Sequence, residues 1–291
     1  MSDAEVTVII PCRNAERVLP DTLAALGAQT IASRMDILVV DNGSTDRTTT
    51  VARSNNVAVM SEEIPSAFRA RNAGIRATST PWLAFLDADC VPDPSWLECL
   101  LEEALERNAH ITSGRIHYTA DDRQWGTRLF LWRKSNVDAR EMVEKQGATP
   151  SGNLLVAREV FDQIGLFNEH PYSSDVAFGR RALGAGLSVV WADAASVRHR
   201  TTYSIVGYLK RCYATRYGQE WLQESSRFQH VLERWPWRPG FRAVRPAMAG
   251  MALSGIWSAL GVWLLLSAER WAGFLGAIHG AWRKKNEDDT A

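Results

Sequence analysis

Short apolar runs alternate with amphipathic segments through the first third of the chain. Runs that predict buried strands fill residues 6–10, 36–40, 57–60 and 82–86, and each leads into a segment whose apolar residues recur at helical spacing. The run at residues 82–86 is uninterrupted, as in a strand buried on both faces. This repeating strand–helix order predicts an α/β fold with a doubly wound, mostly parallel sheet and right-handed crossovers.

The middle of the chain is less regular but still alternates between the two kinds of element. Its helices are expected to end at glycines, a common helix stop. The pattern predicts strands at residues 110–118, 154–157 and 188–191, and helices at 124–144, 158–164 and 175–183.

The C-terminal part is dominated by apolar residues. Residues 246–268 carry no charge, and this uncharged stretch is long enough to cross a bilayer as a helix. After Glu269 and Arg270, an amphipathic stretch of residues 271–282 is too short to cross again. With basic residues on both sides, a re-entrant or in-plane helical pair whose flanks are both cytosolic satisfies the preference for positive residues inside. The alternative is a buried helical hairpin packed on the rest of the protein.

Composition narrows the class of protein. A chain of 291 residues suits one large domain, or one domain with an appendage. Its net charge is zero, so the overall balance gives no support for a nucleic-acid partner. The four cysteines lack metal-like spacing and favour a reducing compartment. No signal peptide is visible at the start.

Acidic side chains follow the predicted parallel strands. Asp87 and Asp89 come directly after the run at residues 82–86, Asp41 follows the second strand and Glu16 the first. The carboxyl ends of parallel strands share one edge of the sheet, where ligands of open α/β sheets bind. Paired carboxylates there suit Mg²⁺ or Mn²⁺ together with substrate phosphates. There is no glycine-rich dinucleotide or Walker loop.

Four motifs in the same order resemble glycosyltransferase family 2. The similarity covers roughly residues 5–200 and implies the GT-A nucleotide-sugar fold and a metal-dependent, inverting transferase. The motifs are Val8-Ile9-Ile10-Pro11 with Asn14 and Glu16, then Val39-Val40-Asp41-Asn42-Gly43-Ser44-Thr45-Asp46, then Arg71-Asn72-Ala73-Gly74, and finally Phe85-Leu86-Asp87-Ala88-Asp89.

The resemblance implies roles for the matching residues. The metal, Mn²⁺ or Mg²⁺, would be held by Asp89 and Asp87, with His199 closing over it; a structural histidine is the alternative for His199. The residues expected to bind the nucleotide-sugar donor are Pro11, Arg13, Asn14, Glu16, Asp41, Ser44, Arg71 and Asp87.

The acceptor half matches the family in part. Ser151, Gly152 and Asn153 would border the acceptor, and Asp175 would be the general base that removes the proton of its hydroxyl group. The family usually has Glu-Asp at this position, where this chain has Ser174-Asp175. The alternative for Asp175 is a helix N-cap.

The resemblance also implies a domain plan. A catalytic domain would occupy residues 1–204, its donor half about 1–115 and its acceptor half about 116–204. A basic helical linker (205–245), membrane-associated helices (246–285) and a tail (286–291) would follow.

These observations predict an enzyme that adds a single sugar from a nucleotide-sugar, most commonly a UDP-sugar in this family, to a hydroxyl acceptor. The acceptor would be lipid-linked or a glycan, at the cytosolic face of the membrane. Processive members carry Gln-x-x-Arg-Trp, whereas Gln229 and Arg234 are spaced too far apart here. The alternatives are a sugar-1-phosphate nucleotidyltransferase and a membrane-tethered nucleotide-sugar binding protein without turnover.

Overall fold

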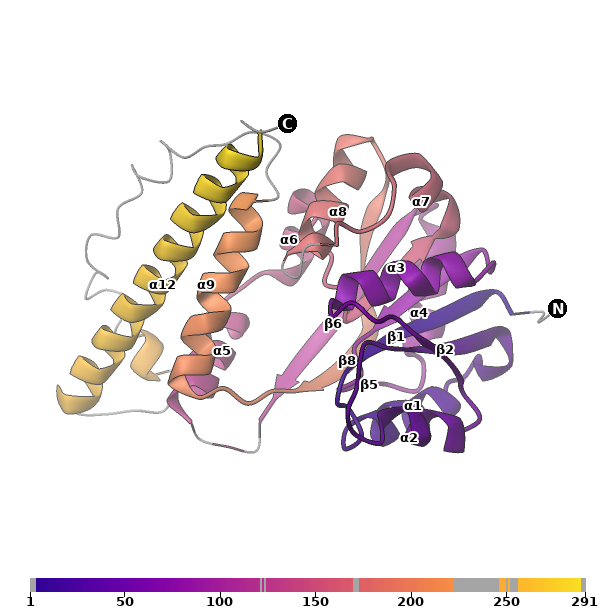
Figure 1. The fold of residues 1–291 in the computed structure, drawn as a ribbon, viewed down its shortest axis with the longest axis horizontal. Coiled ribbons are helices and arrows are strands. Elements are labelled where there is room, and N and C mark those ends of the chain that lie inside the picture. The colour runs from indigo at the N-terminus through magenta and orange to yellow at the C-terminus, as the bar shows by residue number, and fades with distance from the viewer. Residues whose placement is uncertain are drawn as a thin grey trace. The chain divides into compact units, whose positions relative to one another are not determined.

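The computed structural model describes residues 4–120, 122, 124–169, 173–221, 246–249, 251 and 256–288 (Figure 1). Gln229, Arg234 and most of the expected basic linker lie outside this part of the chain. Contacts divide the protein into two compact units. Unit 1 comprises Met1–His117 with Asp138–Arg200, and unit 2 comprises Tyr118–Val137 with Thr201–Ala291. Residues 118–137, expected in the acceptor half, thus group with the C-terminal part.

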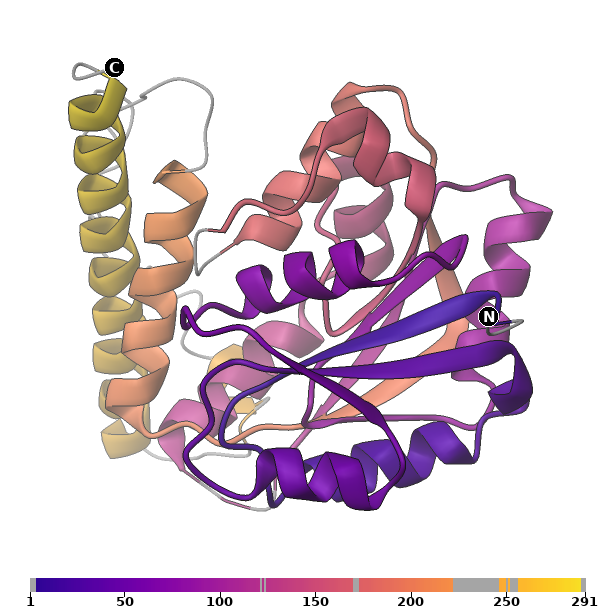
Figure 2. The ribbon, with the colours of Figure 1, turned by 45° about the vertical axis from the view of Figure 1, so that its right-hand side comes forward.

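Unit 1 is organised by an eight-stranded sheet with helices on both faces (Figure 2). The strand order is β3-β2-β1-β4-β7-β6-β8-β5. The strands are β1 (Val6–Cys12), β2 (Met35–Asp41), β3 (Ala58–Ser61), β4 (Trp82–Leu86), β5 (Cys90–Pro92), β6 (Ile111–Thr119), β7 (Asn153–Ala157) and β8 (Val189–Arg200).

The first four strands form the predicted parallel half of the sheet. In β1, Val8 pairs with Ile37 of β2 on one side and Ala84 of β4 on the other, and β3 lies parallel to β2. The prediction of a mostly parallel sheet is wrong for the other four strands. Strand β7 runs antiparallel to β4 and β6, and β5 runs antiparallel to β8. The regular strand–helix repeat that enforces parallel pairing ends at β4, and in the less regular sequence beyond it β7 enters the sheet in the direction opposite to its two neighbours.

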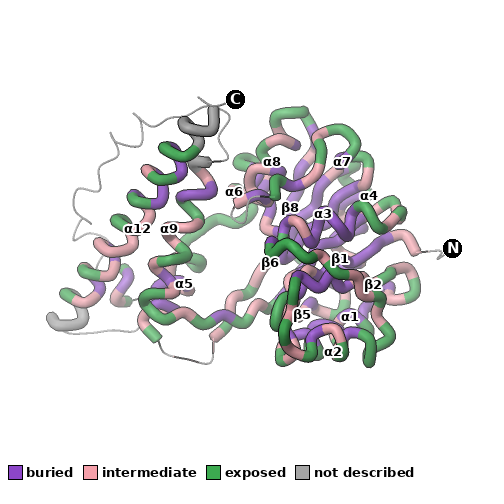
Figure 3. Tube along the Cα trace, viewed as in Figure 1, coloured by how far each residue is buried: buried purple, intermediate pink, exposed green. Residues whose placement is uncertain are grey.

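The central strands are mostly buried (Figure 3), and because successive side chains of a strand point to opposite faces, the sheet has a hydrophobic core on each face. Val8 and Ile10 pack on one face with helices α1 (Leu19–Gly27) and α4 (Trp96–Glu106). Ile9 points to the other face, which is covered by the remaining larger helices. Because both faces are covered, the strands read as continuous apolar runs. The helices of the second face are α3 (Ala67–Ala77), α6 (Ala139–Gln146), α7 (Arg158–Ile164) and α8 (Ser174–Gly184).

The helix predicted for residues 124–144 is two helices in different units. Helix α5 (Trp125–Ser135) belongs to unit 2, whereas α6 belongs to unit 1. Asp138 starts α6 by accepting a hydrogen bond from the Glu141 N–H at 3.0 Å. This cap, which the apolar spacing alone did not indicate, separates the two helices. Two short elements complete unit 1, the 3-10 turn η1 (Ala32–Arg34) and α2 (Thr48–Ser54).

Unit 2 is helical and encloses a core of its own. Helices α9 (Ile205–Trp221) and α12 (Ile256–Asp288) pack together with α5. Phe130 and Tyr208 belong to the apolar cluster between them. Next to that cluster Arg133 pairs with Glu269 at 2.9 Å, and Tyr208 donates to the same carboxylate at 3.0 Å.

The expected boundary between two C-terminal helical segments at Glu269 and Arg270 is wrong. Helix α12 continues without a break through Glu269 and Arg270, where the sequence suggested a boundary between two segments. Glu269 is only 15% exposed and meets Arg133 of α5, so its charge is matched inside unit 2 and does not end the helix. A bilayer crossing needs about 20 apolar residues in one helix, and no helix in the described part of the chain offers such a stretch.

Candidate active site

The candidate site lies at the carboxyl edge of the parallel strands in unit 1. Strand β4 ends at Leu86, and Asp87 and Asp89 follow it at once. Strand β5 starts at Cys90 and pairs antiparallel with β8, which sets Cys90 opposite His199. The long strand β8 therefore reaches further than the short segment predicted from sequence, and it delivers His199 to the same edge.

Four potential metal ligands converge here. The ligand atoms of Asp87, Asp89, Cys90 and His199 all lie within 4.8 Å of one another, and the His199 Nε2 is 3.6 Å from the Asp89 Oδ1. Two carboxylates and an imidazole suit Mn²⁺ or Mg²⁺ with room for phosphate oxygens. Three of these four residues were predicted from the sequence, and Cys90 was not, although its place directly after Asp-x-Asp was an available signal.

The electrostatics of this cluster favour a cation. Burial is the main cause that raises the pKa of Asp89, and the neighbouring Asp87 raises it further, while His199 opposes both effects. Burial and the same two carboxylates also raise the pKa of the Cys90 thiol, which is fully buried. A divalent cation would remove the repulsion between these carboxylates, so the residues present fit a metal.

Arg71 places a positive charge beside the metal ligands. It extends from α3, is only 3% exposed, and pairs with Asp87 through its Nη2. Its guanidinium also lies over the Phe68 ring at 5.0 Å. The Arg71 Nε is buried and has no hydrogen-bond partner among the described residues, so it remains available for a phosphate oxygen.

Asp41, at the end of β2, offers an unused acceptor. The residue is 7% exposed, and its Oδ2 accepts a long hydrogen bond of 3.4 Å from the Ser44 N–H. Its buried Oδ1 has no partner among the described residues. A buried carboxylate oxygen without a donor is costly, and a ribose hydroxyl or a base N–H would satisfy it.

The loop after β1 is tied to the loop after β2. Asn14 has a left-handed backbone (φ 52°), and its Oδ1 accepts from the Thr45 N–H at 2.8 Å. The Ser44 Oγ accepts from the Asn14 N–H at 3.0 Å, and Glu16 accepts from the Arg47 N–H at 3.1 Å. Asn14 and Glu16 thus hold the two loops together, next to the half-buried Pro11 and the exposed Arg13.

Asp175 lies in the first turn of α8. Its Oδ1 accepts from the Val176 N–H at 2.9 Å and its Oδ2 from the Ser151 N–H at 3.3 Å. Burial raises the pKa of Asp175, against the lowering effect of these donors and of Arg71. The helix N-cap is Ser173, so Asp175 does not have the N-cap role considered as its alternative.

Residues 151–153 link Asp175 to the metal cluster. Ser151 donates to Asp175, and a Cβ at Gly152 would lie 2.9 Å from the Asp87 Oδ2. Asn153 is completely buried, and its amide holds the Trp96 ring nitrogen and the carbonyls of Arg115 and Ala195 at 2.8–3.0 Å. The Asn153 side chain thus joins the start of β7 to the middle of β6 and β8 and to α4.

This arrangement defines a class. An open α/β sheet with an acidic metal cluster, a buried arginine and a partly buried carboxylate at one edge is the architecture of a GT-A glycosyltransferase. The sequence profile of Glycosyl transferase family 2 matches residues 7–165, more than half of the chain. The chain belongs to this family.

Several characterised and uncharacterised proteins are similar in sequence. Glycosyltransferase AglE of Haloferax volcanii is 33% identical over 196 residues, which cover 64% of this chain and 64% of AglE, slightly less than two thirds of its length. An uncharacterized glycosyltransferase of Mycobacterium tuberculosis is 42% identical over 200 residues, 66% of this chain and 85% of that protein. The homologues therefore identify the chain as a glycosyltransferase.

Solved structures share the fold. The mannosyltransferase PcManGT of Pyrobaculum calidifontis, in complex with GDP-Man and Mn²⁺, superposes with a TM-score of 0.65 at 15% identity, covering 98% of this chain and 87% of that one. Residues 1–349 of S. aureus TarS in complex with UDP give 0.56 at 15% identity, covering 97% and 92%. At such identities the likeness establishes the fold alone.

Proposed function

We propose that this protein is a metal-assisted, inverting transferase that moves one sugar from a nucleotide-sugar to a hydroxyl acceptor. The observation that carries the proposal is the placement of Ser151 and Gly152. Ser151 donates its N–H to Asp175, and Gly152 lies so close to Asp87 that an added Cβ would be 2.9 Å from its Oδ2, so a base and a donor-site carboxylate lie beside one short backbone segment. Such proximity is what direct attack of an acceptor on a bound donor requires.

The donor side would be organised by charge. Asp87, Asp89 and His199 would hold Mn²⁺ or Mg²⁺, and the ion would supply Lewis-acid stabilisation of the negative charge on the leaving diphosphate. Arg71 would bind a phosphate oxygen through its free Nε. Asp41 would accept a hydrogen bond from the nucleoside through its unpartnered Oδ1.

The acceptor side depends on Asp175. Its ionised carboxylate would take the proton of the acceptor hydroxyl as the oxygen forms its bond to the anomeric carbon. Attack from the face opposite the departing diphosphate inverts the configuration there. The Ser151 and Val176 N–H groups fix the carboxylate in one orientation, and burial makes it a stronger base than an exposed aspartate.

We propose a UDP-sugar as the donor and a lipid-linked or glycan acceptor at the cytosolic membrane face. UDP is the nucleotide in the TarS complex, whereas the PcManGT complex contains GDP-Man, so GDP is the competing choice.

Support for a membrane comes from one face of α12, where large apolar side chains stay exposed. At about 100° per residue they fall within an arc of roughly 60°. They are Leu260, Leu264, Trp271, Leu275 and Trp282.

Binding of nucleotides tests the proposal. Thermal shift and isothermal titration with UDP and GDP, each with and without Mn²⁺, are expected to give binding that requires the metal. Asp89→Ala should lose the metal-dependent part while keeping the fold. Metal-independent binding, or equal binding by Asp89→Ala, would contradict the assigned site. A membrane role would be contradicted by recovery of the full chain in the low-salt soluble fraction without detergent.

A further inference from the structure

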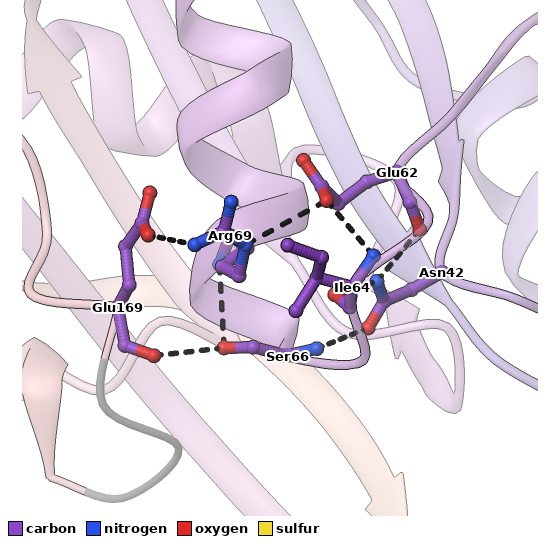
Figure 4. Close-up of polar contacts among 6 residues, drawn as sticks. All are labelled: Asn42, Glu62, Ile64, Ser66, Arg69 and Glu169. Atoms are coloured by element: carbon purple, nitrogen blue, oxygen red, sulfur yellow. Dashed lines mark hydrogen bonds and ion pairs between the residues drawn. The ribbon is translucent and has the colours of Figure 1, made fainter.

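Arg69 lies between two acidic side chains that belong to opposite sides of the site (Figure 4). Its Nη1 pairs with the Glu169 carboxylate, and its Nε is 3.6 Å from the Glu62 Oε1. Arg69 is in the first turns of α3, two residues before Arg71. Arg69, Glu62 and Glu169 have no part in the chemistry proposed above.

The Glu62 side of this contact is tied to the nucleotide end of the site. The Glu62 N–H donates to the Asp41 carbonyl at 2.8 Å. Asn42, the next residue after Asp41, donates from its Nδ2 to the Glu62 carbonyl at 3.0 Å and the Ile64 carbonyl at 2.8 Å, and accepts from the Ser66 N–H at 2.7 Å. The loop of residues 62–66 is therefore fixed to the strand end that carries Asp41.

The Glu169 side is tied to the helix that carries Asp175. The Asn72 amide brackets the backbone of the buried Phe167, donating to its carbonyl at 2.8 Å and accepting from its N–H at 3.1 Å. The Phe167 ring lies 4.5 Å from the Phe178 ring of α8. Phe167, two residues before Glu169, thus contacts α8 directly, and Ser66 adds a hydrogen bond of 3.2 Å to the Glu169 carbonyl.

The Arg69–Glu169 ion pair is a poor candidate for a purely stabilising role. The Arg69 side chain is 28% exposed and that of Glu169 is 40% exposed. Ion pairs at this exposure contribute about 0–1 kcal/mol to stability, because water screens them. The Phe167 cluster and Asn72 already fix the fold of this segment, so what Arg69 adds is a connection between the nucleotide end and the α8 end of the site.

We infer that Arg69 is a positioning residue that couples occupation of the nucleotide site to the placement of Asp175. A nucleotide held by Asp41 orders the strand end and residues 62–66, and Arg69 transmits that order through Glu169 and the neighbouring Phe167 to α8. The inference rests on the proposed function, since it assumes a nucleotide at Asp41 and a base at Asp175. Coupling between two such sites is typically about fivefold or more.

The test compares Arg69→Gln with wild type by two measurements. The first is the rate of UDP or GDP release from whichever nucleotide-sugar the wild type hydrolyses, with water as acceptor and Mn²⁺ present. The second is hydrogen exchange of residues 164–169 and 174–180 with and without Mn²⁺ and the nucleoside diphosphate. Arg69→Gln is expected to lower the maximal rate about fivefold, leave the nucleotide Kd within about twofold, and abolish nucleotide-induced protection of α8.

Matched variants separate coupling from folding. Glu169→Gln should reproduce the effect, the double variant should add nothing to it, and Arg69→Lys should recover most of the rate. Arg34→Gln breaks an ion pair with Glu5 of similar exposure elsewhere in unit 1 and should leave every measurement unchanged.

Two results would overturn the inference while leaving the proposed function intact. In the first, Arg69→Gln keeps the wild-type rate and the wild-type hydrogen-exchange protection, while Asp175→Asn is inactive. The other is a loss of nucleotide affinity that accounts for the whole loss of rate. Full activity in Asp175→Asn would instead refute the proposed base, and the inference with it.

Discussion

Gly152 lies so close to Asp87 that adding a single methyl group tests the geometry of the site. A Cβ at Gly152 would lie 2.9 Å from the Asp87 Oδ2 and 3.4 Å from its Cγ. Ordinary contact is about 3.5 Å, so one partner must move by about half an ångström. Gly152 is not among the glycines with a left-handed backbone, so Gly152→Ala tests space alone.

Asp87 cannot move freely, because Arg71 holds it. The Arg71 side chain is 4% exposed and cannot follow the carboxylate outward. Displacing Asp87 therefore weakens a hydrogen bond between charged groups, worth about 1.5–3 kcal/mol. If that loss appears in ligand binding, the affinity for a metal–nucleotide complex falls roughly 10- to 150-fold.

Isothermal titration of UDP or GDP into the protein in the presence of Mn²⁺ measures this loss of affinity directly. The matched control is Gly184→Ala at the end of α8, where an added Cβ meets nothing within 4 Å and binding should be unchanged. Thermal unfolding of both variants checks the fold. Wild-type affinity in a folded Gly152→Ala would refute the reasoning that Asp87 is held rigidly beside this glycine.

Five further outcomes follow from the structure. Asp175→Asn should lower turnover by about 10²–10⁴-fold with donor affinity retained, which a rate and a titration measure together. The wild-type rate should rise with pH through the raised pKa of Asp175, and a pH profile of Asp175→Asn should lack this limb. Because that pKa lies above its unfolded value, its stabilising contribution is present at low pH and lost as pH rises through the folded-state pKa; denaturation series should show Asp175→Asn without that slope. Asp41→Asn should weaken UDP or GDP binding about tenfold without lowering the Tm, since it alters an unpartnered oxygen. Glu269→Gln should lower the Tm by about 2–4 °C, because Arg133 and Tyr208 lose a charged partner; an unchanged melting curve would show that this pair is not stabilising.

Much of the donor half could be predicted because its signals are local. The apolar runs that form β1, β2 and β4 end at polar residues, and parallel pairing then brings Asp41, Asp87 and Asp89 to one edge regardless of details elsewhere. Local signals could not place His199, because it reaches the cluster only through the length of β8 and its register against β5.

Other features depend on contacts between residues far apart in the chain, which spacing does not reveal. The antiparallel placement of β7 is set by its neighbours β4 and β6. The uninterrupted α12 depends on Arg133 meeting Glu269, 136 residues away. The sequence shows two adjacent charges, Glu269 and Arg270, in an apolar stretch, whereas the structure shows that Glu269 is ion-paired with Arg133. The same holds for Arg69, whose partner Glu169 lies 100 residues further on.

Release of nucleoside diphosphate from a panel of nucleotide-sugars tests the central claim most directly. Wild type, Asp89→Ala and Asp175→Asn would be compared with Mn²⁺ and with a chelator present. The account predicts turnover of at least one UDP- or GDP-sugar by the wild type with Mn²⁺ alone, and loss of that turnover in each folded variant. Equal turnover in the chelator, or in either variant, would contradict a metal-assisted transfer with Asp175 as its base.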